Sequence, residues 1–281
     1  MHKFVLALFA NALAPVAARG SASAVAARGN ARANFCGTIP VNAQFNKADK
    51  SIIRRGDLGN ATELRIDVYM HVIARPEENK HNKTEFLLSR NDLEKQIDVL
   101  NKSFKPAKIY FSLKSVDWVV ENLTSYYSKS LKGLLSNQVL KSLQKGNRSA
   151  LNLYFYNATD DVGGITGWPT STNGEVSGCI VSSNTVPGGA NLRWNMGKTA
   201  VHEVGHWLGY DWHTDLGVDC GYNEHNCAPE PECVNYMARS NDTCIFEFNS
   251  DQNLLMHNFL EKLQQNSTPL SFMDLAHAKN H

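Results

Sequence analysis

The feature that most constrains the fold of this chain is the nine-residue segment VHEVGHWLG at residues 201–209. Its two histidines are four residues apart, so on an α-helix they lie one turn apart on the same face and both imidazoles can bind one metal ion. Glu203 projects about 100° away from His202 around the helix axis. It therefore lies beside the ion and is placed to accept a proton from a metal-bound water. The segment predicts a helix with one metal-binding face and one apolar face.

The residues after this segment predict a third metal ligand. Gly209 can adopt a positive φ and end the helix sharply, which lets the chain turn back beneath the ion. His213 follows after a short turn, and a third imidazole nitrogen would complete a zinc site of the catalytic kind. Two alternatives stay open: Asp211 as the third ligand, or a site of two histidines alone.

The N-terminus predicts a secretion signal. An apolar run from Phe4 to Ala18 follows two polar residues and crosses only Asn11. This run is shorter than the ~20 apolar residues of a membrane span, and small residues follow it as at a signal-peptidase site. We expect residues 1–24 to be a cleaved signal peptide, residues 25–35 a short pro-segment or linker, and residues 36–281 a single domain.

Sequons and cysteines also favour an extracellular protein. Eight Asn-x-Ser/Thr sequons predict a glycoprotein; they lie at Asn60, Asn82, Asn101, Asn122, Asn147, Asn157, Asn241 and Asn266. An even number of cysteines, four of them within residues 220–244, is typical of a disulfide framework formed in an oxidising compartment. The cysteines are Cys36, Cys179, Cys220, Cys227, Cys233 and Cys244.

The charge balance excludes some partners. With 28 basic and 27 acidic residues, nothing draws the chain toward nucleic acid or an anionic membrane surface. No later segment approaches the length of a membrane span. We expect a secreted monomer without a nucleic-acid or membrane partner.

Hydrophobic periodicity predicts strands that alternate with helices. The expected strands cover residues 63–73, 109–120, 151–156 and about 179–182. The expected helices begin at a cap on Asn91, near Leu131, near Lys198 and at a cap on Ser250. This order predicts an α+β fold: a twisted, mixed and mostly parallel sheet backed by helices in an upper part to about residue 209. A small irregular lower part, about 210–265, and a short tail follow.

Several segments closely resemble the pappalysin-type metzincins, and among them the secreted fungal metalloproteases. Residues 202–209 carry the resemblance together with Pro187-Gly188-Gly189 and Asn195–Thr199 before them. Asn235-Tyr236-Met237 is similar to the Met-turn of that family, and Phe35–Thr38 is similar to the start of its catalytic domain.

The chain departs from the metzincin pattern at two positions. The pattern His-Glu-x-x-His-x-x-Gly-x-x-His has Trp212 at its last place, and His213 comes one residue later. The turn must absorb this extra residue, which loops tolerate well. Many metzincins of this type place a tyrosine two residues after the Met. Here Arg239 stands there, either supplying positive charge to an oxyanion or facing solvent.

The resemblance implies specific roles. His202, His206 and His213 would bind one catalytic zinc ion, Glu203 would be the general base, and Met237 would form the hydrophobic floor beneath the metal. The implied disulfides are Cys220–Cys233, Cys227–Cys244 and Cys36–Cys179, with a latency thiolate at Cys36 as the alternative. Acidic residues between the third histidine and Cys233 would offer oxygen ligands to calcium, although solvated loop charges are the favoured interpretation. They are Asp215, Asp219 and Glu224, with Asp211 just before.

These observations together predict a metzincin-like zincin: a secreted zinc endopeptidase that hydrolyses peptide bonds of extracellular proteins. Zinc polarises a water, Glu203 takes its proton, and the departing amine receives that proton. An extended polypeptide substrate is expected to pair with an edge strand near Cys179–Ser183. The rival hypothesis is a catalytically silent or weakened secreted relative that binds zinc and acts by binding a partner.

Overall fold

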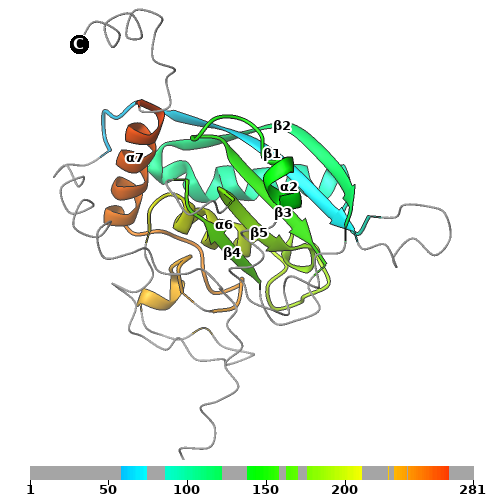
Figure 1. The fold of residues 1–281 in the computed structure, drawn as a ribbon. Coiled ribbons are helices and arrows are strands. Elements are labelled where there is room, and N and C mark those ends of the chain that lie inside the picture. The colour runs from blue at the N-terminus through cyan, green and yellow to red at the C-terminus, as the bar shows by residue number, and fades with distance from the viewer. Residues whose placement is uncertain are drawn as a thin grey trace, which may run out of the picture. The chain divides into compact units, whose positions relative to one another are not determined.

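A five-stranded mixed sheet is the frame of the protein (Figure 1). The computed structural model describes the following residues, all within the unit Asn34–His281: 58–74, 86–121, 138–157, 163–169, 176–210, 227, 231–238 and 240–265. The strands are β1 (Leu64–Ala74), β2 (Ile109–Val120), β3 (Leu151–Tyr156), β4 (Gly164–Gly167) and β5 (Gly178–Ser182). The strand order is β2-β1-β3-β5-β4, and only β4 is antiparallel to its neighbour. The predicted α+β fold with a mostly parallel mixed sheet is confirmed.

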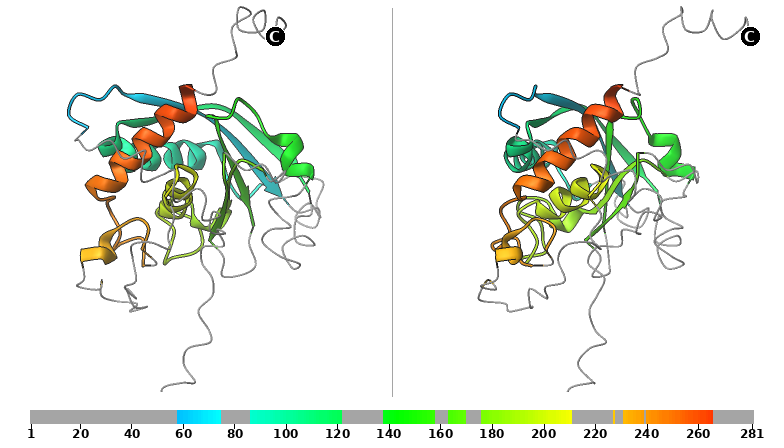
Figure 2. Two further views of the ribbon diagram at one scale, coloured as in Figure 1. Left: turned by 60° about the vertical axis from the view of Figure 1, so that its left-hand side comes forward. Right: turned by 90° about the vertical axis from the view of Figure 1, so that its left-hand side faces the viewer.

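The main core lies between the sheet and three helices. These are α2 (Arg90–Phe104), α6 (Lys198–Trp207) and α7 (Ser250–Gln265), which all lie on one side of the sheet in Figure 2. Every second residue of β1 contributes to this core, as the strand period requires. The contributing residues are Leu64, Ile66, Val68, Met70 and Val72.

The opposite face of the sheet is covered by α5 (Gln138–Leu143). The core on this face is smaller and consists of buried residues from β1, β3, β4, β5 and α5 and from the segment just before β5. They are Ile73, Leu140, Tyr154, Tyr156, Ile165, Val176 and Ile180. Residues 138–143 agree with the predicted helix in this region, while its expected start near Leu131 lies outside the described residues.

Two helix caps differ from prediction. Ser89, and not Asn91, caps α2: the Asp92 N–H donates to Ser89 Oγ, and the Ser89 N–H donates to Asp92 Oδ2 at 3.0 Å. Asn249, and not Ser250, caps α7, since it exchanges the same two bonds with Gln252 at 2.7 and 2.8 Å. In both cases the third residue of the first turn reaches back to the cap, a capping box that fixes the start of the helix.

The edge of the sheet also differs from prediction. The strand expected near residues 179–182 is present as β5, but it lies between β3 and β4 and is not an edge strand. The edge beside it is β4, which pairs antiparallel with β5 from Gly164–Val181 to Gly167–Gly178. The sequence did not predict β4 because four residues that include two glycines carry no readable period.

Three short 3₁₀ segments complete the described elements: η2 (Lys105–Ala107), η3 (Ser183–Thr185) and η4 (Pro231–Val234). In the described part of the chain, none of the helices combines the length and apolarity that crossing a bilayer would need.

Candidate metal centre

Helix α6 is buried along almost its whole length, so its orientation is fixed by the packing around it. Residues Thr199 to Trp207 are all buried. The chain enters the helix through Gly197, at φ 80°, whose carbonyl accepts a hydrogen bond from Gln96 Nε2 of α2 at 2.9 Å. It leaves through Gly209, at φ 92°, where Tyr210 N–H donates to the carbonyl of Gly205 at 3.1 Å. The predicted positive φ at Gly209 is confirmed.

The two histidines of α6 present their outer nitrogens to each other. His202 Nε2 and His206 Nε2 are 3.1 Å apart. The Nδ1 atom of His202 lies 2.9 Å from the Tyr236 carbonyl, and that of His206 lies 2.8 Å from the Tyr210 carbonyl. Because a carbonyl oxygen only accepts, each Nδ1 carries the proton, and in the neutral rings each Nε2 offers a lone pair.

This arrangement fits a zinc ion. Two Zn–N bonds of ~2.05 Å at a tetrahedral angle hold their nitrogens ~3.3 Å apart, close to the separation of the two Nε2 atoms. Backbone carbonyls that orient the remaining ring nitrogens are also what metal-binding histidines require. In the described residues no group of three His, Cys, Asp or Glu side chains comes together that could hold a metal ion.

Strand β4 holds Glu203 from the side. The hydroxyl of Thr166 lies 2.7 Å from Glu203 Oε2 and 2.9 Å from the Glu203 carbonyl oxygen. A methyl group added at Gly164 would come within 2.6 Å of Glu203 Cγ. Glu203 and Thr166 are both almost completely buried. Sequence reasoning found neither Thr166 nor Gly164, because a threonine and a glycine in so short a strand form no recognisable motif.

Met237 packs directly beneath the helix. Its Sδ would lie only 2.8 Å from a Cβ added at Gly205, so a glycine is required between the two histidines for this close approach. The turn that carries Met237 is fixed by Asn235, whose Oδ1 accepts the Met237 N–H at 2.9 Å. The Asn235 and Gln252 side-chain amides then exchange two hydrogen bonds, which join the turn to α7.

Several predicted site residues lie outside the described residues: Cys36, Asp211, His213, Asp215, Asp219, Cys220, Glu224 and Arg239. The roles assigned to them stay predictions. Of the predicted site, the structure therefore brings together the two histidines of α6, Glu203 and Met237.

One of the three expected disulfides lies wholly within the described residues and is present. Cys227 and Cys244 are bonded with a Cα–Cα distance of 5.3 Å, as the resemblance implies. Cys233 is also disulfide-bonded, and its expected partner Cys220 is outside the described residues. The Sγ of Cys179 lies 3.7 Å from Thr166 Oγ1. Cys179 has no exposed surface, and its expected partner Cys36 lies outside the described residues, so this bridge stays a prediction.

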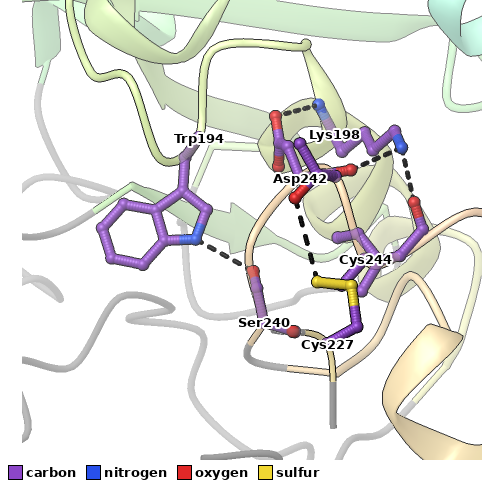
Figure 3. The surroundings of a disulfide bond; sticks show 8 residues. Trp194, Lys198, Cys227, Ser240, Asp242 and Cys244 are labelled. Atoms are coloured by element: carbon purple, nitrogen blue, oxygen red, sulfur yellow. Dashed lines mark hydrogen bonds between the residues drawn. A yellow bond between two sulfur atoms is a disulfide. The ribbon is translucent and has the colours of Figure 1, made fainter. Parts of the chain in front are cut away.

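A buried carboxylate anchors the start of α6 (Figure 3). Asp242 Oδ2 accepts hydrogen bonds from Met196 N–H at 2.7 Å and Lys198 N–H at 3.4 Å. The Lys198 ammonium also bonds the segment that carries Asp242, since it donates hydrogen bonds to the carbonyls of Asp242 and Ile245. Burial raises the pKa of Asp242 to about 6, although these backbone N–H groups act in the opposite direction.

Solved structures of mirolysin from Tannerella forsythia resemble this chain. A mutant of Tannerella forsythia promirolysin matches with a TM-score of 0.57 and 20% identity, covering 82% of this chain and 92% of that one. Mature mirolysin in complex with a cleaved peptide matches with a TM-score of 0.50 and 20% identity, covering 74% and 100%. At this identity the likeness establishes a shared fold, and it agrees with the metzincin-like fold expected from the sequence.

Curated relatives identify the family. An extracellular metalloprotease of Colletotrichum graminicola is 31% identical over 277 residues, covering 84% of this chain and 94% of the relative. One from Pyricularia oryzae is 32% identical over 247 residues, covering 78% and 83%. No protein-family model matches the chain. The chain belongs to the family of these extracellular metalloproteases.

The carboxyl of Asp242 predicts a specific pH dependence of stability. Its pKa of about 6 in the folded protein lies above the ordinary value of 3.8, so folding favours the protonated form. The contribution to stability is full below pH 4 and is lost as pH rises through 6, by about 3 kcal/mol. We expect the melting temperature of Asp242→Asn, relative to wild type, to rise between pH 4 and pH 7. Parallel melting curves across this range would contradict the prediction.

Proposed function

We propose that this protein is a secreted zinc endopeptidase of the pappalysin-type metzincins. The observation that carries the proposal is the facing pair of Nε2 atoms on α6 with the Glu203 carboxylate held beside them by β4. Membership of the extracellular metalloprotease family supports the same conclusion. Two histidines oriented by carbonyls, a buried carboxylate and an adjacent strand at the edge of the described sheet are the parts that metal-assisted hydrolysis of a polypeptide requires.

His202 and His206 would hold one zinc ion through Nε2, with His213 as the proposed third ligand. When bound, zinc supplies Lewis acidity, which acidifies water and polarises a peptide carbonyl. The Tyr236 and Tyr210 carbonyls keep both rings in the tautomer that binds metal. Met237, packed against Gly205, supports the helix from below and excludes water there.

Glu203 is the proposed general base, and Thr166 is its partner in both protonation states. The threonine hydroxyl has one hydrogen and two acceptors within reach, Glu203 Oε2 and the Glu203 carbonyl. While the carboxylate is ionised, the hydroxyl donates to Oε2. Once the carboxyl has taken a proton, the hydroxyl donates to the carbonyl and accepts from the carboxyl instead. The side chain therefore keeps a hydrogen bond while it moves a proton toward the departing amine.

The substrate is proposed to bind along β4. One side of β4 pairs with β5 and the other is the edge of the sheet, so an extended peptide can add to it through main-chain hydrogen bonds. The same strand carries Gly164 and Thr166, which touch Glu203. A peptide bonded to β4 would thus be held beside the carboxylate that acts on it.

The route to the extracellular space is the predicted signal peptide, residues 1–24. The names of the relatives support this part of the proposal, since they are extracellular enzymes. The predicted glycosylation belongs to the same route, because sequons are modified only in the secretory pathway.

Replacement of the general base tests the proposed chemistry. We expect Glu203→Gln to lose peptide hydrolysis by a factor of at least ~10², the usual contribution of a general base, while zinc content stays that of wild type because Glu203 is not a ligand. Glu94→Gln on the exposed surface of α2 is the matched control. Cleavage of a quenched peptide and elemental zinc analysis are measured on the same samples. Full activity of Glu203→Gln would refute its role as general base. A wild-type protein that binds zinc but does not hydrolyse peptides would favour the rival hypothesis of a catalytically silent relative.

Replacement of Thr166 tests the positioning of Glu203. We expect Thr166→Val to lower kcat by a factor of ~10–100, since a hydrogen bond to a charged group contributes ~1.5–3 kcal/mol, and to leave KM nearly unchanged. Thr166→Ser keeps the hydroxyl and should restore most of kcat. Equal kcat values for the valine and wild-type proteins, at comparable melting temperatures, would show that Thr166 does not act through Glu203.

A further inference from the structure

Two sequons of this chain have opposite surroundings. Asn147 lies in the turn between α5 and β3, and both Asn147 and Arg148 are exposed. Its Oδ1 accepts two hydrogen bonds from the third residue of the sequon, one from Ser149 N–H at 3.0 Å and one from Ser149 Oγ at 2.9 Å. This is an Asx turn. Both bonds go to Oδ1, so Nδ2 takes no part in the turn, and the bonds polarise the amide to which Nδ2 belongs.

In Asn101, by contrast, both the oxygen and the nitrogen of the side-chain amide make hydrogen bonds. Asn101 lies in the last turns of α2 and reaches β2, the strand at the other edge of the sheet. Its Nδ2 donates to the Phe111 carbonyl at 3.1 Å, and its Oδ1 accepts the Phe111 N–H at 2.8 Å. In a parallel sheet both groups of one residue point to the same side, so the Asn101 amide takes the place of a neighbouring strand at this position of the edge.

The helix also excludes an Asx turn at Asn101. Within α2 the backbone N–H of Ser103 belongs to the helical hydrogen-bond ladder, whereas the N–H of Ser149 is available to turn back to Asn147. A glycan on Asn101 would have to grow from the nitrogen that bonds Phe111, in the space between α2 and β2. Edge strands need such protection against unwanted pairing, which gives the Asn101 side chain a structural role.

We infer that Asn147 carries an N-linked oligosaccharide and that Asn101, in spite of its sequon, is an unmodified cap of the β2 edge. The donor is a lipid pyrophosphate-linked oligosaccharide. Asn147 Nδ2 forms a bond to the anomeric carbon, the bond from that carbon to the pyrophosphate oxygen breaks, and the amide gives up one proton; no group is oxidised or reduced. The inference rests on the proposed secretory route and is independent of the proposed catalysis.

The test is a glycopeptide map of the full chain, purified from the medium of a eukaryotic secretory host. Enzymatic deglycosylation in ¹⁸O-water converts each occupied asparagine to labelled aspartate. We expect label at Asn147 and none at Asn101. If the chain's own N-terminus does not deliver it to the medium, the secretory route is wrong. In that case the same chain is secreted with a heterologous signal peptide, and the ¹⁸O label at Asn147 and Asn101 is measured in the same way.

A matched pair of variants separates the two roles. Asn147→Gln should lose the mass of one glycan. The two bonds to Ser149 that it breaks lie in an exposed turn, so its melting temperature should fall less than that of Asn101→Gln. Asn101→Gln should lose no mass and melt several degrees lower, because its longer side chain cannot make both bonds to Phe111. An unlabelled Asn147 or a labelled Asn101 in the wild-type map overturns the inference, and this result does not depend on whether either variant folds.

Discussion

The site depends on one constraint: each α6 histidine donates Nδ1–H to a backbone carbonyl from a different part of the chain. The Tyr210 carbonyl follows the helix directly, whereas the Tyr236 carbonyl arrives from a turn about thirty residues later. These bonds fix the tautomer of both rings and point the two Nε2 atoms at one place. Two hydrogen bonds between the Asn235 and Gln252 side chains join the turn at Tyr236 to α7. The orientation of both rings therefore depends on the turn at Tyr236 and, through Asn235 and Gln252, on α7.

Strand β4 is the second organising element, because it serves two purposes with four residues. Gly164 makes room for the Glu203 side chain, Thr166 contacts its carboxylate, and the strand forms one edge of the described sheet. The proposed base and the proposed binding edge thus cannot move apart without breaking the sheet. Helix α6 is fixed at its start as well, since Lys198 donates two hydrogen bonds to Asp242, from its backbone N–H and from its ammonium. Two residues after Asp242, the Cys227–Cys244 disulfide holds the same segment.

The sequence predicted the long periodic elements well and the short ones poorly. The strands at Leu64–Ala74, Ile109–Val120 and Leu151–Tyr156 repeat the expected ranges within a residue, because alternation over six or more residues is readable. The caps at Ser89 and Asn249 were missed, since each depends on a side chain reaching back from three residues ahead. The place of Cys179 in the core was also missed, because a count of cysteines does not reveal which of them the fold encloses.

The sequence by itself determined the chemistry of the site, because the spacing of His202, Glu203 and His206 on a helix fixes which side chains share a face, and Gly209 fixes where the helix ends. Only the tertiary structure decided which groups would orient those side chains. Thr166, Gly164 and the carbonyl of Tyr236 are distant from α6 along the chain and carry no local pattern, and strand pairing and helix packing alone bring them to it.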